Sequence, residues 1–352
     1  MAGLDRDLSL CVINTYFAPL PAYARLYLDT CRHNPEVRFL FISDQARPSE
    51  LPPNVTWLRM TLGELADRLQ SALGFRVGLT ASLKVCDVRP AFGLAFASAL
   101  RGFTHWAYSD IDLLWGRILP LLRPHVGSAD VLSFRERCLS ATFTVFRNTP
   151  ENARLFLRAP DIEDTLGSTA YHDFDESCSR WDRPRSFSEL WRGGMRTSLW
   201  DVLAEGHAVG DLRWVHPELL AEPDPRRKAF AFRWDDGVLT DAATGEERIA
   251  YHLLGAKDAP FFSVPSWRSM PRSVQITEAG IADARGGLRS AAFHARRLGV
   301  GVPRYAAGVS GRAWRRLQRE TASWRRGPAS LGRAVLSPRH PRDAPWDGLR
   351  SV

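Results

Sequence analysis

Two aspartates, Asp110 and Asp112, lie within the apolar segment WAYSDIDLLWG, residues 106–116. Burial of a carboxylate is costly unless another group compensates its charge. Two close carboxylates also repel each other, and a divalent cation between them removes this repulsion. Carboxylate oxygens suit Mg²⁺ or Mn²⁺, which keep coordination positions open for phosphate oxygens. The pair therefore predicts a metal ion that holds a diphosphate leaving group.

Two other interpretations of this Asp-x-Asp triplet exist. In the first, Asp110 caps a helix and Asp112 is a surface residue, because three-residue patterns of this kind are common. The apolar residues on both sides argue against it, since a solvated acidic loop does not need them. In the second, one aspartate is the nucleophile of a haloacid dehalogenase phosphatase, whose motif ends the first strand of the domain. Here the motif begins more than a hundred residues into the chain and leucines follow it.

The elements that must position this pair alternate along the first 150 residues. Apolar runs typical of strands are followed by segments with helical spacing, one of which opens with a capping box at Thr61 and Glu64. We expect strands at residues 8–17, 37–44, 55–60, 103–116, 129–134 and 142–148. This alternation predicts a doubly wound, mostly parallel sheet, whose ligands bind beyond the carboxyl ends of the strands. Asn14, Thr15 and Asp44 lie at such ends, and we expect Asn14 and Thr15 to contact a nucleotide.

Two further segments complete the expected fold. Residues 80–100 have helical spacing with a kink or restart at Pro90. Residues 230–252 predict a β-hairpin, because the arms alternate and the DDG and ATGEE stretches provide turn residues.

Three blocks of the sequence resemble nucleotide-sugar glycosyltransferases of the GT-A fold: KVCDVRPAFG, THWAYSDIDLLWGRI and YHLLGAK. The likeness is to bacterial polysaccharide-type glycosyltransferases in which a K-x-x-D-x-[KR]-P-x-[FY]-G block precedes the D-x-D block. It extends from about Leu8 to Pro271 and does not cover the basic tail. It implies an α/β, GT-A-like (Rossmann-like) fold with a mostly parallel mixed sheet flanked by helices. The hairpin and a basic helical C-terminal extension would be added to that sheet.

The resemblance also assigns metal and phosphate roles to matched positions. In GT-A enzymes the D-x-D carboxylates bind Mn²⁺ or Mg²⁺, so Asp110 and Asp112 would be metal ligands. In the glycogenin-like and galactosyltransferase-like branch, a late H-x-x-G-x-K-P-W block supplies a third metal ligand and a lysine for the phosphates. His252, Gly255 and Lys257 match this block, although Asp-Ala replaces its Pro-Trp. An imidazole ligand favours Mn²⁺ over Mg²⁺; the alternative is that His252 is an exposed histidine at a strand end.

The same resemblance assigns donor binding to the block that precedes the D-x-D strand. In related enzymes a helix at this place presents an aspartate and a basic residue to the nucleotide, which implies this role for Lys84, Asp87 and Arg89. The alternative is a simple helix ion pair, which contributes little to stability.

An acidic cluster in YHDFDESCSRW, residues 171–181, lies where GT-A enzymes build their acceptor side. A carboxylate there would deprotonate the acceptor hydroxyl or orient it. Asp175 is the first candidate for this catalytic role and Glu176 is the second. The alternative is that these acids favour the start of a helix through its dipole.

The net charge of +8 comes from the C-terminal tail. Residues 284–352 contain fifteen arginines, no lysine and three acids, so residues 1–283 carry a net charge of −4. This asymmetry removes the argument for nucleic-acid binding by the fold itself. Basic amphipathic segments with tryptophans between residues 284 and 335 suit an anionic membrane surface. The alternatives for the tail are nucleic-acid binding through arginine-rich helices and a solvated, partly ordered segment.

Cysteine and hydropathy patterns indicate the compartment. The five cysteines contain no C-x-x-C pair and their number is odd, which argues against a disulfide framework and against a zinc–thiolate site. We find no apolar stretch long enough to cross a bilayer, and the N-terminus lacks the basic region of a signal peptide. We therefore expect a cytoplasmic protein, peripheral at the inner face of the membrane if the tail binds lipid.

These observations predict a metal-dependent glycosyltransferase of the hexosyltransferase type, with a UDP-sugar donor and a polysaccharide or glycolipid acceptor. Its catalytic domain would span residues 1–271, with a nucleotide-binding half at about 1–150 and an acceptor side at about 151–271. The Arg-rich extension, residues 272–352, would be partly disordered. The alternatives are a catalytically inactive carbohydrate- or membrane-binding protein and a nucleotidyltransferase. The latter needs a Gly-rich basic loop after the first strand, which NTYFAPLPAY lacks.

Overall fold

A computed structural model gives the fold for part of the chain. Its described residues all belong to one compact unit, Met1–Tyr305. They are residues 8–127, 129–133, 139–159, 161–175, 203–205, 231–242, 244–253, 257, 263–277 and 280–285. The basic segments expected between residues 286 and 335, and Glu176, lie outside them.

A six-stranded sheet forms the centre of the described fold, with strand order β3-β2-β1-β4-β7-β6. Strands β1 to β4 pair in parallel, whereas β7 is antiparallel to both β4 and β6. The strands are β1 (Leu10–Thr15), β2 (Val37–Ser43), β3 (Val55–Arg59), β4 (His105–Ser109), β6 (Val131–Ser133) and β7 (Phe143–Arg147). The predicted α/β class with a mostly parallel mixed sheet is confirmed.

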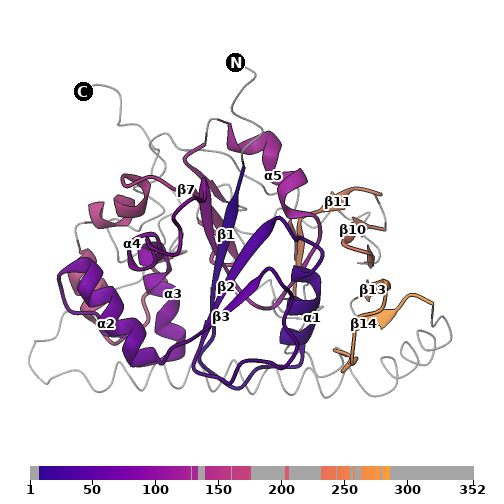
Figure 1. Ribbon diagram of the computed structural model, residues 1–352, viewed down its shortest axis with the longest axis horizontal. Coiled ribbons are helices and arrows are strands. Elements are labelled where there is room, and N and C mark those ends of the chain that lie inside the picture. The colour runs from indigo at the N-terminus through magenta and orange to yellow at the C-terminus, as the bar shows by residue number, and fades with distance from the viewer. Residues whose placement is uncertain are drawn as a thin grey trace, which may run out of the picture. The chain divides into compact units, whose positions relative to one another are not determined.

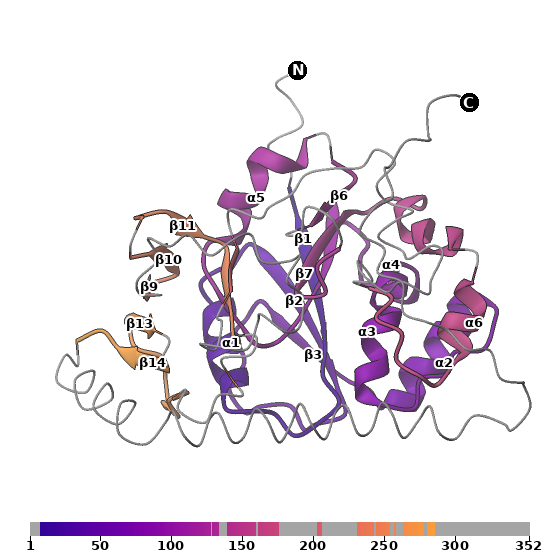
Figure 2. The ribbon, with the colours of Figure 1, turned by 180° about the vertical axis from the view of Figure 1, so that it is seen from behind.

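Helices cover both faces of this sheet (Figures 1 and 2). Alternate residues of β1 divide between two apolar cores, with Ile13 facing one and Val12 the other. The Val12 core is closed by α1 (Tyr23–Cys31) and α5 (Ile118–Val126). The Ile13 core is closed by α2 (Leu62–Leu73), α3 (Val85–Val88), α4 (Phe92–Ala95), α6 (Ile162–Gly167) and the 3-10 helix η3 (Asn152–Arg158).

The expected breaks in the helices occur where the sequence places them. Thr61 and Glu64 form the predicted capping box at the start of α2. The segment around Pro90 divides into short helices: η1 (Ser82–Lys84), α3, η2 (Arg89–Ala91) and α4. Pro90 occupies a first-turn position of η2, where its missing N–H leaves no bond unmade.

The prediction of a single strand over residues 103–116 is wrong. The segment divides into β4 and β5 (Leu113–Trp115), which belong to different sheets, with the aspartate triplet between them. Strand β5 is antiparallel to β12 (Ala250–His252), which is parallel to β8 (Leu203–Glu205). Both halves are apolar because both are buried, so hydropathy alone does not mark the division.

A five-stranded antiparallel sheet holds the predicted hairpin, with order β11-β10-β9-β13-β14 (the orange strands of Figure 1). The β9–β10 turn uses Asp236 and Gly237, both with positive φ, as expected for DDG. The second predicted arm divides at Ile249, after which β12 joins β5 instead. The strands are β9 (Ala231–Asp235), β10 (Val238–Asp241), β11 (Glu247–Arg248), β13 (Ser273–Thr277) and β14 (Gly280–Asp283), so the sheet continues past residue 271.

The cysteines and the hydropathy of the helices are the basis of two other expectations. Cys11, Cys31 and Cys86 are free thiols, whereas Cys138 and Cys178 lie outside the described residues. Among the helices that the structure describes, none has both the length and the apolar character needed to span a bilayer.

Candidate metal centre

The Asp-x-Asp triplet forms the crossing between the six-stranded sheet and the three-stranded sheet. The Asp110 N–H donates to the Thr142 carbonyl at 3.0 Å, which fixes the side of the crossing next to β7. The Leu253 N–H donates to the Asp112 carbonyl at 2.9 Å, which fixes the side next to β12. The two backbone bonds hold both aspartates at the line where the sheets meet.

Strand β12 brings His252 to this crossing from 140 residues further along the chain. Its register places His252 opposite Leu113, one residue from Asp112. The His252 Nε2 atom lies 3.4 Å from the Asp112 Oδ2 atom, and its Nδ1 atom lies 3.3 Å from the Thr142 hydroxyl. One ligand atom from each of Asp110, Asp112 and His252 lies within 4.8 Å of the others.

This arrangement of three donor atoms fits a small divalent cation. Two carboxylate oxygens and one imidazole nitrogen are the donor set expected for Mn²⁺, and also acceptable to Mg²⁺. Two ligands on opposite sides of an ion of this size are about 4 Å apart, which is comparable with the 4.8 Å within which these three atoms lie. Asp112 and His252 are buried, whereas the Asp110 side chain is 27% exposed, so the cluster is accessible from the Asp110 side.

Lys257 supplies a positive charge at the same carboxylate. Its Nζ atom forms an ion pair with the Asp112 Oδ2 atom and lies 6.0 Å from the centre of the Tyr23 ring. Burial alone would raise the pKa of Asp112, but His252 and Lys257 outweigh it and hold that pKa well below its usual range. The Asp112 carboxylate is therefore ionised, which is the form that binds a cation.

Arg89 connects Asp110 to the acidic segment that follows α6. Its guanidinium donates to Asp110 Oδ1 at 2.5 Å, to the Ala141 carbonyl at 2.8 Å and to Asp175 Oδ2 at 3.4 Å. Burial alone would lower the pKa of Arg89. The negative charges of Asp110 and Asp175 outweigh burial and raise this pKa above its usual value, so the side chain stays a cation. The structure thus brings three predicted residues, Arg89, Asp110 and Asp175, into one ion-pair network.

Lys84 and Asp87 form a buried ion pair away from solvent. The Lys84 side chain is 1% exposed and the Asp87 side chain is fully buried. Lys84 Nζ donates to Asp87 Oδ2 at 2.9 Å and to the Thr165 carbonyl at 2.7 Å. Asp87 also accepts the backbone N–H groups of His172 and Phe174 at 2.8 and 2.7 Å. The pair therefore fixes residues 172–174; the donor contact expected from its sequence stays a prediction.

Asn14 and Thr15 lie at the carboxyl end of β1, as expected. Asn14 is fully buried and its amide donates to the Ser109 carbonyl and hydroxyl at 3.0 and 2.6 Å. Its carbonyl oxygen accepts from the Tyr27 hydroxyl at 2.6 Å. In this structure Asn14 therefore positions the last residue of β4, directly before Asp110, and Thr15 is 9% exposed beside it. Their contact with a nucleotide stays a prediction.

The profile of a family of unknown function, DUF6625, matches residues 12–255. The chain belongs to this family. The matched range includes β1, both aspartates and His252, and ends before Lys257. No curated protein matches the sequence.

Three solved structures that are similar to this DUF6625 protein are glycosyltransferases. Mouse xyloside xylosyltransferase 1 shares 10% identity at a TM-score of 0.40, over 70% of this chain and 97% of the mouse chain. The galactosyltransferase LgtC, solved with donor and acceptor sugar analogues, shares 10% identity at a TM-score of 0.32, over 48% of this chain and 71% of its own. The glycosyltransferase GlyE of Streptococcus pneumoniae TIGR4 shares 12% identity at a TM-score of 0.33. The match covers 55% of this chain and only 45% of the GlyE chain.

Two residues near the Asp110–Asp112–His252 cluster of this DUF6625 protein have no signal in the sequence. Thr142 contacts both sides of the cluster, through its carbonyl to Asp110 and through its hydroxyl to His252. Tyr23 provides the ring beside Lys257. Thr142 directly precedes β7, and the pairing of β4 with β7 and of β5 with β12 brings it to the cluster. Tyr23 begins α1, and the packing of α1 against β5 brings it to the same place.

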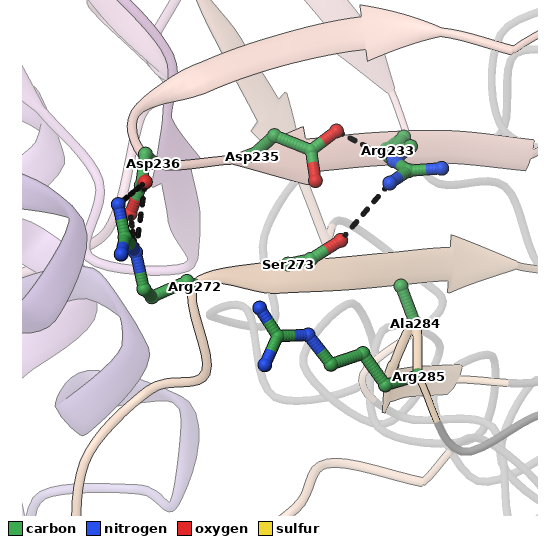
Figure 3. Close-up of a pocket in the computed structure, with 7 residues that line it drawn as sticks. All are labelled: Arg233, Asp235, Asp236, Arg272, Ser273, Ala284 and Arg285. Atoms are coloured by element: carbon green, nitrogen blue, oxygen red, sulfur yellow. Dashed lines mark hydrogen bonds and ion pairs between the residues drawn. The ribbon is translucent and has the colours of Figure 1, made fainter.

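A separate pocket of about 310 Å³ lies on the five-stranded sheet (Figure 3). Four of its five charged residues are paired with one another, because Arg233 donates to Asp235 at 2.5 Å and Arg272 Nε donates to Asp236 Oδ2 at 2.9 Å. The pocket is not lined by Asp110, Asp112, His252 or Lys257. The lining residues are Arg233, Asp235, Asp236, Arg272, Ser273, Ala284 and Arg285.

Proposed function

We propose that this protein transfers a sugar from a nucleotide-sugar donor with the help of a divalent metal ion. The observation that supports this proposal is the cluster of Asp110, Asp112 and His252, with Lys257 at its edge. The first two residues come from the end of the central sheet, and the third comes from a strand about 140 positions later. The resemblance of the three sequence blocks to GT-A glycosyltransferases supports the same chemistry.

Asp110, Asp112 and His252 would hold the metal, and Mn²⁺ suits this mixed oxygen and nitrogen set better than Mg²⁺. When bound, the ion would act as a Lewis acid that neutralises the diphosphate leaving group. The charged side chains of the protein support that task. Lys257 adds a mobile positive charge for the phosphates. Arg89 keeps the Asp110 carboxylate at the edge of the cluster through a 2.5 Å ion pair.

We further propose that the donor is a UDP-sugar and the acceptor is a polysaccharide or a glycolipid. Asp175 is the candidate that orients or deprotonates the acceptor hydroxyl, since its carboxylate is tied to the cluster through Arg89. Glu176 remains the second candidate. Asn14, Thr15, Lys84 and Asp87 remain the candidates for donor binding, and the basic tail for an anionic membrane surface.

The test is the release of UDP from a panel of UDP-hexoses by the full-length chain, with Mn²⁺ or with EDTA. We expect Mn²⁺-dependent release that EDTA abolishes. Asp112→Asn should reduce the rate by at least about 100-fold, because it removes a charged ligand of the ion that stabilises the leaving group. Asp67→Asn, at an exposed position of α2, is the matched control and should leave the rate unchanged. Equal rates in Asp112→Asn and the wild type would reject the proposal.

A further inference from the structure

One oxygen of Asp112 already contacts two basic groups. Its Oδ2 atom forms the ion pair with Lys257 Nζ and lies 3.4 Å from His252 Nε2. This is the carboxylate that any ion held by the Asp110–Asp112–His252 cluster must also use. Lys257 and a metal ion therefore depend on the same ligand group.

Burial makes this dependence strong. The Asp112 side chain is 5% exposed, so its charge needs a positive partner. Lys257 is such a partner, and a dication is another. Two cations at one buried carboxylate repel each other much more strongly than they would in water. Binding of the ion and retention of the Lys257 ion pair are consequently opposed.

Lys257 has the freedom to leave Asp112. Its side chain is 28% exposed, and the ammonium group sits on a flexible stem. The Tyr23 ring, 6.0 Å away, offers a second favourable surface for the charge. A diphosphate beside the cluster would offer a stronger partner than either.

We propose that Lys257 competes with the metal ion for Asp112 and moves to the diphosphate when the metal ion and the nucleotide bind together. This inference rests on the proposed function and adds a linkage to it. The lysine weakens metal binding in the free protein, and the diphosphate relieves that weakening by taking the lysine. Metal and nucleotide then bind cooperatively, each raising the affinity of the other by the same factor.

The test is a titration of the full-length chain with Mn²⁺, in which free Mn²⁺ is followed by electron paramagnetic resonance. Lys257→Met removes the competing charge at a partly exposed site and keeps most of the side-chain volume. We expect it to bind Mn²⁺ about five- to tenfold more tightly than the wild type without nucleotide. UDP should then raise the Mn²⁺ affinity of the variant by a smaller factor than it raises that of the wild type. Arg117→Met removes an exposed cation that pairs with Glu247 and is the matched control.

The outcomes separate this inference from the function on which it rests. Mn²⁺ affinity that is equal or lower in Lys257→Met than in the wild type overturns the competition. Tight Mn²⁺ binding in the wild type alongside that result would leave the metal centre itself intact. Failure of both proteins to bind Mn²⁺, while their thermal unfolding matches, overturns the proposed function and the competition together.

Discussion

The imidazole of His252 is held by two side chains that differ in their task. Asp112 lies at Nε2, where a metal would also bind, whereas Thr142 lies at Nδ1 on the opposite side of the ring. A hydrogen bond at the distant nitrogen fixes which nitrogen faces the cluster. The ring orientation is therefore determined by a residue that is not itself a candidate ligand.

This role of Thr142 leads to a prediction for metal affinity. Thr142→Val keeps the shape of the side chain but removes the hydroxyl, so the His252 ring loses its fixed orientation. Loss of such an outer partner commonly weakens metal binding by about 10- to 100-fold, and we expect about tenfold for Mn²⁺. The same Mn²⁺ titration measures it. Thr142→Ser keeps the hydroxyl and should bind like the wild type; equal affinities for the valine and serine variants would contradict the role.

The short helices around Pro90 act as one structural element that serves the site. Lys84 and Asp87 face inward and hold residues 165 and 172–174, while Arg89, less than one turn later, reaches Asp110 and Asp175. The buried pair thus fixes the segment whose next residue is Asp175. Lys84, Asp87 and Arg89 are only three and two residues apart, so the buried ion pair and the contact with the aspartates come from one short segment.

Removal of one member of this pair should be costly for folding. Lys84→Met leaves the Asp87 carboxylate buried without its ammonium partner, and a broken buried ion pair typically lowers the free energy of unfolding by about 3–5 kcal/mol. Arg117→Met breaks the exposed pair with Glu247 and should lower it by at most about 1 kcal/mol. Urea denaturation of both variants gives the comparison. Similar small losses in the two variants would show that the buried pair is not structurally important.

The order of helices and strands could largely be predicted from the sequence, but the sheet to which each strand belongs could not. The alternation of strands and helices, the capping box at Thr61 and the break at Pro90 are local signals, and all three are present in the structure. The division of residues 103–116 into β4 and β5 was not predictable, because β5 finds its partner, β12, about 135 residues later. The pattern of apolar residues indicates which residues are buried, and both halves of this segment are buried. It does not indicate the sheet to which a strand belongs.

At the scale of the described fold, the two smaller sheets meet at Trp115 and Gly116, next to the end of α1. The Trp115 carbonyl accepts from the Trp234 indole at 2.8 Å, which ties β5 to β9. The Gly116 N–H donates to the Ile249 carbonyl at 2.8 Å, at the point where β11 gives way to β12. The Gly116 carbonyl accepts from Asn34 at 2.9 Å, close to the end of α1. The position of His252 therefore depends on close backbone packing at Gly116.

Gly116→Ala tests this dependence at the scale of the molecule. A Cβ atom at this position would lie 2.3 Å from the Arg248 carbonyl oxygen, so the chain between β11 and β12 must shift. Overpacking of this kind costs about 1–3 kcal/mol, and we expect a loss of about 2 kcal/mol in urea unfolding together with weaker Mn²⁺ binding. Gly127→Ala is the matched control, because its Cβ meets nothing within 4 Å and its backbone is right-handed helical. That variant should unfold at the same or slightly higher urea concentration and bind Mn²⁺ like the wild type. Full Mn²⁺ affinity in a destabilised Gly116→Ala protein would show that His252 is positioned by β5 alone and not by the junction of the sheets.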